Sequence, residues 1–201
     1  AERRAVMKRP HGVVVASKNA DKIAEVEAVL AALDPPVEVI PGHIWEDVAE
    51  TQDTLAGNAL LKARAVAAAT GHAAIADDTG LEVDALDGAP GVHSARYAGE
   101  SATYEENVEK MLRELGDAEG RGARFRTAVA LVTPAGEELV VEGVLEGVIS
   151  REPRGDGGFG YDPILEVVGS GGADGRTLAE IPAAEKNRIS HRAQALRALA
   201  E

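Results

Sequence analysis

The stretch GVVVASKNADKIAEVEAVLAALDPPVEVI, residues 12–40, decides the fold class. Its β-branched opening at 12–17 predicts a buried strand, and VEVI at 37–40 predicts a second one. Between them, apolar residues recur at helical spacing, at Ile23, Val26, Leu30 and Leu33. A strand, a polar turn, a helix and another strand form a βαβ-like unit, which predicts an α/β protein.

The rest of the chain continues this alternation. Its hydrophobic pattern predicts helices over 54–71, 103–115 and 185–200, a strand over 73–77, and a hairpin of strands 123–132 and 137–150. Glycine-rich loops separate several of these elements, but no repeat or long linker divides the chain. We therefore predict a single domain over 12–201, preceded by an N-terminal extension at 1–11.

Composition excludes several functions. The chain has 201 residues and a formal net charge of −13, which argues against a sequence-independent grip on nucleic acid polymers and against docking on anionic membranes. It has no cysteine, so disulfides and thiolate catalysis are excluded. No run approaches the roughly 18 apolar residues of a membrane span. These features predict a cytoplasmic protein.

The first polar segment is SKNADK, residues 17–22, at a predicted strand-to-helix turn. Free N–H groups at a helix N-terminus favour phosphate, and Lys18 and Lys22 add positive charge. The alternative is a capped helix with solvated lysines. The segment lacks the glycines of a Walker loop.

The second is AIADDTGLEVD, residues 74–84, in which a strand is predicted to end at Asp77 and Asp78 and to turn at Gly80. Adjacent carboxylates suit a hard cation such as Mg²⁺, which binds one or two carboxylates together with phosphate oxygens. The alternative is a turn whose carboxylates cap backbone amides. An aspartyl-phosphatase motif is excluded, because the residues two positions after these aspartates are Thr79 and Gly80.

The remaining two segments are FGYD at 159–162 and EKNRISHRAQAL at 185–196. In a chain with few aromatic residues, Phe159 and Tyr161 on a glycine-rich loop could form a stacking wall for a base, or fold into the core. The second segment carries a basic cluster that includes His191 and Arg192. On its own such a cluster is most often a solvated helix face.

Together and in this order, the segments ASKNADK, ADDTGLEVDALDGAPGVHSARYAG, REPRGDGGFGYDP and EKNRISHRAQAL resemble the inosine triphosphate pyrophosphatase family, from about residue 12 to residue 200. The resemblance implies an elongated mixed β-sheet with flanking helices and two lobes around a central substrate cleft, commonly in a homodimer. It also implies Mg²⁺-dependent hydrolysis of the non-standard purine triphosphates ITP, dITP and XTP to a monophosphate and pyrophosphate.

The resemblance assigns roles to individual positions. Asp78 matches the general base and metal site, Glu50 matches a metal-binding glutamate, and Asp77 is expected to help hold the metal. The implied substrate-binding set is Ser17, Lys18, Asn19, Ala20, Asp21, Lys22, Lys62, Thr79, Phe159, Gly160, Tyr161, Asp162, Lys186, His191 and Arg192. Arg192, with His191, is expected to donate to the 6-keto oxygen of the base, which adenine lacks.

One position departs from the family pattern. The family often has phenylalanine-x-glutamate-asparagine-alanine where this chain has LAGNA, so Gly57 replaces a glutamate. A helical glycine is expected to cost roughly 0.5–1 kcal/mol. Two alternatives therefore stay open: a catalytically impaired nucleotide-binding regulator, and a related pyrophosphatase for other modified triphosphates.

Overall fold

The computed structural model describes residues 8–169 and 175–200, so most of the predicted extension at 1–11 lies outside the described residues. The helices are α1 (Ala20–Ala31), α2 (Leu55–Thr70), α3 (Tyr104–Leu115), α4 (Ala183–Ile189) and α5 (His191–Ala198), with short 3-10 turns η1 (Asp84–Leu86), η2 (Ser94–Arg96) and η3 (Asp162–Ile164). The strands are β1 (Gly12–Val15), β2 (Glu38–Val39), β3 (Ala74–Val83), β4 (Pro90–Gly91), β5 (Gly122–Val132), β6 (Glu138–Ile149) and β7 (Leu165–Val167).

The strands form one mixed sheet in the order β2-β1-β3-β5-β6-β7, with β4 paired to β3. β1 is parallel to both β2 and β3, as expected for the predicted βαβ opening. From β3 onward the pairings are antiparallel, and β5 and β6 form the predicted hairpin. The predicted α/β class and mixed sheet are confirmed.

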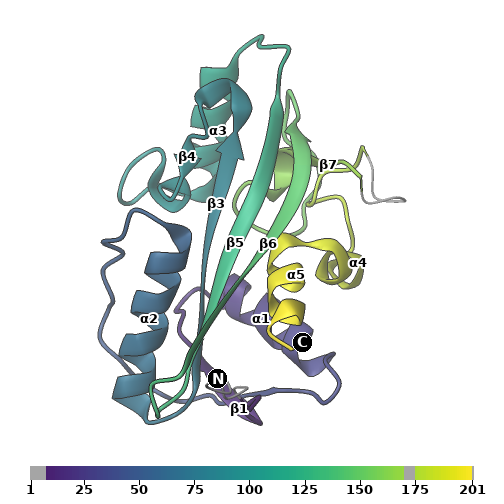
Figure 1. Cartoon of the computed structure of the whole chain (residues 1–201). Coiled ribbons are helices and arrows are strands. Elements are labelled where there is room, and N and C mark those ends of the chain that lie inside the picture. The colour runs from purple at the N-terminus through teal and green to yellow at the C-terminus, as the bar shows by residue number, and fades with distance from the viewer. Residues whose placement is uncertain (1–7, 170–174, 201) are drawn as a thin grey trace, which may run out of the picture.

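Helices cover both faces of the sheet, and the long strands β3, β5 and β6 run through the whole elongated molecule (Figure 1). The lower lobe in Figure 1 contains β1, α1, α2 and α5, and the upper lobe contains α3, β4 and β7. In the lower lobe, α2 packs on one face of the sheet over small residues such as Ala74, Ala76 and Ala128. On the opposite face α1 and α5 enclose a second core that includes Ile75 and Val129. In the upper lobe, α3 and the segment around β7 enclose a third core.

α5 lies directly against β6 at Gly143. A methyl group at this position would overlap with the carbonyl oxygen of His191 and would come within 2.8 Å of the backbone nitrogen of Ala195. Glycine is therefore required here, because only a strand without a side chain lets a helix backbone come this close. The contact fixes how near α5 lies to the sheet.

The sequence-based prediction for β3 was wrong in one respect. The strand does not end at the aspartates but continues through them to Val83. Gly80 is extended rather than a turn residue, and its missing side chain leaves room for the carbonyl oxygen of Gly91, which would lie 2.6 Å from an added methyl. Since side chains alternate along a strand, Asp77 and Asp78 project to opposite faces of the sheet.

The predicted C-terminal helix is in fact two helices. Ser190 adopts an extended conformation between α4 and α5, and its side chain accepts a hydrogen bond from the N–H of Ala193. Serine is a strong N-cap, so it ends one helix and begins the next. The break brings Lys186 of α4 and Arg192 of α5 to the same cavity, described below.

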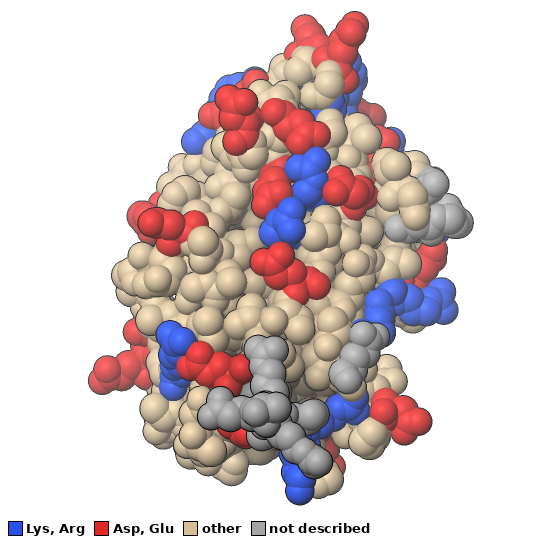
Figure 2. All heavy atoms as spheres, in the orientation of Figure 1, with Lys and Arg blue, Asp and Glu red and all other residues tan. Residues whose placement is uncertain are grey.

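The outer face of the upper sheet is charged. Figure 2 shows basic and acidic side chains alternating over the long strands. Arg124 pairs there with Asp84 and Glu146, and Arg126 pairs with Glu82. No helix among residues 8–169 and 175–200 is long and apolar enough to span a membrane.

Candidate active site

A gap in the pairing of β3 marks the site. On one edge of this strand, β1 pairs with Ala74 and Ile75, and β4 pairs with Leu81 and Glu82. Within the described part of the chain, the stretch between these partners, residues 76–80, forms strand pairs only with β5 on the other edge. The DDTG residues therefore lie along an open strand edge, where a ligand can reach groups from both faces of the sheet.

On the α2 face of β3, Asp78 lies among groups from α2 and the loop before it. The side-chain amide of Asn58 donates to Asp78 at 3.1 Å, and Lys62 Nζ lies 3.7 Å from the same carboxylate. Lys62 also donates to Glu50 at 2.8 Å and to the backbone carbonyl of Asp77 at 2.7 Å. One ammonium group thus bridges Asp78 and Glu50, two of the three carboxylates predicted to hold a metal.

The pKa values of these groups follow from burial and charge. Burial raises the pKa of Asp78, and the neighbouring Lys62 only partly opposes this. Burial also disfavours ionisation of Glu50, but attraction by Lys62 outweighs it and the pKa of Glu50 is lowered. Burial acts against the ammonium of Lys62, yet Asp78, Asp77 and Glu50 together raise its pKa. Raised carboxyl pKa values beside a cation are typical of functional sites.

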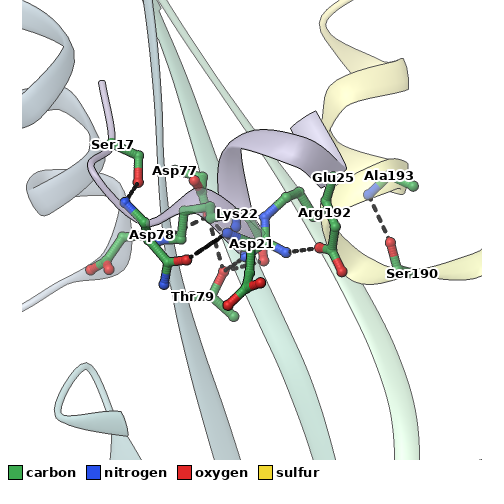
Figure 3. Close-up of polar contacts among 12 residues, drawn as sticks. Ser17, Asp21, Lys22, Glu25, Asp77, Asp78, Thr79, Ser190, Arg192 and Ala193 are labelled. Carbon is green, nitrogen blue, oxygen red and sulfur yellow. Dashed lines mark hydrogen bonds and ion pairs between the residues drawn. The ribbon is translucent and has the colours of Figure 1, made fainter. Parts of the chain in front are cut away.

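On the opposite face, Asp77 binds cations. Lys22 Nζ lies 3.3 Å from its carboxylate, and Arg192 donates to it from two nitrogens, each at 3.2 Å. Figure 3 shows Lys22, Thr79 and Arg192 gathered beside Asp77, with Glu25 on the far side of Arg192. Burial would raise the pKa of Asp77, but these cations hold it far below its usual range. Its metal role remains a prediction, since Lys22 and Arg192 already bind its carboxylate.

The network extends from Arg192 toward α4. Glu25 on α1 accepts hydrogen bonds from both Arg192 and Lys186, and Lys186 also pairs with Asp162 at 2.5 Å. With Lys22 and Asp77, three cations and three carboxylates form a nearly buried, electrically balanced group. Burying so many charges costs stability, so such a network is better explained by binding than by folding.

This network forms one wall of a cavity of about 130 Å³ between the two lobes. Two-thirds of the predicted substrate-binding set line this cavity: Asn19, Lys22, Thr79, Phe159, Gly160, Tyr161, Asp162, Lys186, His191 and Arg192. Much of the remaining cavity lining comes from Phe125, Tyr104 and Asn107. The cavity therefore combines aromatic rings with charged groups, as a nucleoside pocket requires.

His191 lies at the base of this cavity. Its ring stacks on Phe125, with centroids 4.6 Å apart, and its Nδ1 is buried without a hydrogen-bond partner among the described residues. Burial and the nearby Arg192 hold the pKa of His191 well below its usual value, so the ring is neutral at pH 7. A neutral ring with a free nitrogen can recognise a polar edge of a ligand.

The turn at 17–22 is ordered by its own side chains. The carbonyl of the Asn19 side chain accepts from the N–H groups of Asp21 and Lys22 and so caps α1, while Ser17 accepts from the N–H of Asn19. Lys18 instead points to solvent and pairs with Asp47. Five residues of the predicted substrate-binding set do not line the cavity but lie on the turn at 17–22 or beside the edge of β3. They are Ser17, Lys18, Ala20, Asp21 and Lys62.

Several residues of the site were not predicted from the sequence. Glu25 lies three positions after Lys22 and hence on the same face of α1, a spacing that could have indicated it. Asn58 was part of the compared motif LAGNA but received no role. Arg96, in GVHSARYAG, extends from the upper lobe to within 3.7 Å of Glu50. Nothing in its spacing signals that contact.

The carboxylates around Lys62 form a small set of oxygen donors. No group of three or more His, Cys, Asp or Glu side chains suited to a metal is found within residues 8–169 and 175–200. Two carboxylates, Asp78 and Glu50, lie around one ammonium group at an open strand edge. Mg²⁺ commonly uses one or two carboxylates and completes its shell with water and substrate phosphates, so this pair fits such an ion.

Comparison with known proteins agrees with this architecture. Residues 13–201 match the Ham1 family. A dITP/XTP pyrophosphatase of Streptomyces coelicolor is 48% identical over 93% of this chain and 94% of its own length, and one of Frankia alni is 50% identical over 94% and 95%. A HAM1 protein from Coxiella burnetii has a solved structure that superposes with a TM-score of 0.81 at 44% identity, covering 94% of this chain and 96% of that one. The resemblance seen in the sequence is therefore confirmed, and the chain belongs to the Ham1 family.

Proposed function

We propose that this protein hydrolyses non-standard purine nucleoside triphosphates, namely ITP, dITP and XTP, to the monophosphate and pyrophosphate. The observation that carries the proposal is the open edge of β3, where Asp78 and Glu50 share Lys62 on one face. On the other face, the cavity places aromatic rings beside buried cations. The names of the relatives given above support the same activity.

The two faces suggest a division of labour. The nucleoside occupies the cavity near His191, and the triphosphate follows the N-terminus of α1 toward the edge of β3. The positive end of the α1 dipole and the ammonium group of Lys22 there favour phosphate oxygens. Asp78 and Glu50 would hold a divalent ion, for which we propose Mg²⁺; when bound, it supplies charge neutralisation of the phosphates.

Asp78 is the proposed general base. It is buried at the strand edge, and the amide of Asn58 and the ammonium of Lys62 orient its carboxylate. It accepts a proton from the water that attacks the α-phosphorus, and the bond to the pyrophosphate leaving group breaks. Lys62 and Lys22 stabilise the negative charge that moves onto the leaving group. Asp77 keeps Lys22 and Arg192 in place for this task.

Base selection rests on the cavity floor. All three guanidinium nitrogens of Arg192 bind Glu25, Asp77 or Thr79, so His191 is the group with a free nitrogen. We propose that Nδ1 of His191 donates to the 6-keto oxygen of hypoxanthine or xanthine. Adenine presents an amino group at that position, and two facing donors cost roughly 1–3 kcal/mol.

The test is pyrophosphate release from ITP, XTP, GTP and ATP with Mg²⁺, for the wild type and for Asp78→Asn. Rapid turnover of the first two is expected, and slow turnover of ATP, whose base lacks the 6-keto oxygen. GTP keeps that oxygen, so its slow turnover would have to come from exclusion of its 2-amino group by the shape of the pocket. Loss of a general base lowers the rate roughly 10²- to 10⁴-fold. Asp84→Asn, on the outer face with Arg124, is the matched control and should retain full activity.

The opposite result separates the two alternatives. Tight binding of ITP without turnover in the wild type would identify a nucleotide-binding regulator. Turnover of other modified triphosphates, with ITP and XTP ignored, would identify a related pyrophosphatase. The homodimer, the cytoplasmic location and the single domain over 12–201 remain predictions, and sedimentation velocity would measure the first.

A further inference from the structure

Tyr104, on the first turn of α3, stands at the mouth of the cavity. Its ring lies 6.0 Å from that of Phe159, centroid to centroid, at an angle of 40°. Its hydroxyl accepts a hydrogen bond from the side-chain amide of Asn19 at 2.9 Å. Tyr104 thus links α3 to two parts of the site, the aromatic wall at Phe159 and the turn at the N-terminus of α1.

The position of Tyr104 is fixed by its helix. Thr103 and Glu106 form a complete capping box, which sets where α3 begins. Asn107, buried on the next turn, donates to the carbonyl of Ala95 and accepts from the N–H of Ala98. The start of α3 is therefore attached to the loop that forms the upper wall of the cavity.

The distances show that the cavity is closed to a purine. A flat base between two rings needs them about 7–8 Å apart, twice the 3.5–4.0 Å separation of carbon atoms in contact. Tyr104 and Phe159 are 6.0 Å apart and contact each other instead. The cavity volume of about 130 Å³ is also below the roughly 300–1,000 Å³ typical of small-molecule sites.

We propose that Tyr104 is a nucleoside-binding residue that also closes the entrance of the pocket. It swings away from Phe159 and releases Asn19 when the purine enters, and its ring then packs on the face of the base opposite Phe159. The residue is 40% exposed, so it borders solvent into which the ring can move. The proposed function supplies only the identity of the ligand.

Two variants separate the ring from the hydroxyl. Tyr104→Phe keeps the ring and removes the bond to Asn19. Tyr104→Ala removes both. Tyr97→Phe is the matched control, because it also removes a tyrosine hydroxyl with a polar partner in the upper lobe, Glu114, outside the cavity lining.

The ligand for the test is inosine monophosphate, which needs no turnover. Its association and dissociation rate constants are measured by NMR line-shape analysis of the hypoxanthine protons. Tyr104→Phe should bind inosine monophosphate with an association rate constant about 2- to 10-fold higher, because the free energy of one neutral hydrogen bond corresponds to a factor of this size. Its dissociation rate constant should stay within about threefold of the wild-type value. From Tyr104→Ala the nucleotide should dissociate about 5- to 150-fold faster, because the free energy of stacking one base on one aromatic ring corresponds to a factor of this size.

Several outcomes overturn the proposal. A dissociation rate for Tyr104→Ala equal to that of Tyr97→Phe shows that the ring does not contact the base. An unchanged association rate for Tyr104→Phe shows that the hydroxyl does not restrain the entrance. Failure of the proposed function is visible separately, because the wild type would then release no pyrophosphate from ITP, whatever the Tyr104 variants do.

Discussion

The close packing of α5 on β6 makes Gly143→Ala a sensitive perturbation. The new methyl would lie 2.8 Å from the backbone nitrogen of Ala195, whereas carbon and nitrogen in contact need about 3.5 Å. The carbonyl oxygen of His191 would lie closer still, so about 0.7 Å is the smallest outward movement of α5 that could relieve these contacts. Such a shift would lengthen the 3.2 Å bonds from Arg192 to Asp77 to about 3.9 Å, beyond hydrogen-bonding distance.

The expected cost has two parts. Overpacking a well-filled interior costs typically about 1–3 kcal/mol. Weakening a buried ion pair adds a fraction of the roughly 3–5 kcal/mol that complete loss of one partner costs. We expect the free energy of unfolding to fall by about 2–4 kcal/mol in total. For a chain of this size that is a fall in Tm of roughly 4–16 °C.

Urea unfolding measures this change, with Gly120→Ala as the control. Gly120 has no neighbouring atom within 4 Å of an added methyl, so its substitution should change stability by less than about 1 kcal/mol. Gly143→Ala should also raise KM for ITP more than it lowers kcat, because α5 carries His191 and Arg192 to the cavity. Equal stability of the two variants within about 0.5 kcal/mol would refute the packing argument.

Three further predictions concern individual side chains. Alanine is a better helix former than glycine by roughly 1 kcal/mol, but Gly57→Ala should not raise Tm. The reason is that its methyl would lie 2.9 Å from the Oγ1 of Thr54, which caps α2. A clear rise of Tm in a thermal melt would contradict this. Asn58→Ala leaves the buried carboxylate of Asp78 without its amide donor and should cost roughly 1–3 kcal/mol in urea unfolding, and an unchanged midpoint would count against that bond. His191 has a lowered pKa, so the unfolded chain binds its proton more tightly and stability falls as the pH drops below about 6.5. The difference between wild type and His191→Gln, measured by urea unfolding between pH 7.5 and 5, should show this dependence, with a slope of at most about 1.4 kcal/mol per pH unit; parallel curves would show that His191 does not titrate on unfolding.

Much of the fold follows from local pattern. The βαβ opening, the helices at 54–71 and 103–115 and the long hairpin were predictable, because each has a clear period and clear end signals. β3 was harder, since two aspartates and a glycine normally end a strand. Here the strand continues because β5 pairs with it throughout and Gly91 fills the space beside Gly80. That is tertiary structure, which a local pattern does not contain.

The site was predictable to a similar extent. The resemblance of the motifs to the family indicated Asp78, Glu50 and the basic residues Lys186 and Arg192 of α4 and α5. In the structure the first two lie at one strand edge, and the other two line the cavity. It did not indicate that Asp77 and Asp78 face opposite sides, which depends on the continuity of β3. Nor did it find Tyr104, whose contacts with Asn19 and Phe159 join segments far apart in the chain and leave no trace in sequence spacing.

The long strands that join the lobes also determine how the protein can deform. β3, β5 and β6 pass without interruption from the lower lobe to the upper, as Figure 1 shows, so no flexible loop serves as a single pivot. A hydrogen-bonded ribbon of this kind resists stretching but accommodates extra twist over its whole length. Separation of the two lobes, as distinct from the swing of Tyr104, should therefore be an elastic motion with small displacements that grow steadily along each strand. Substitutions that stiffen the ribbon far from the ligand should reduce how far the lobes separate.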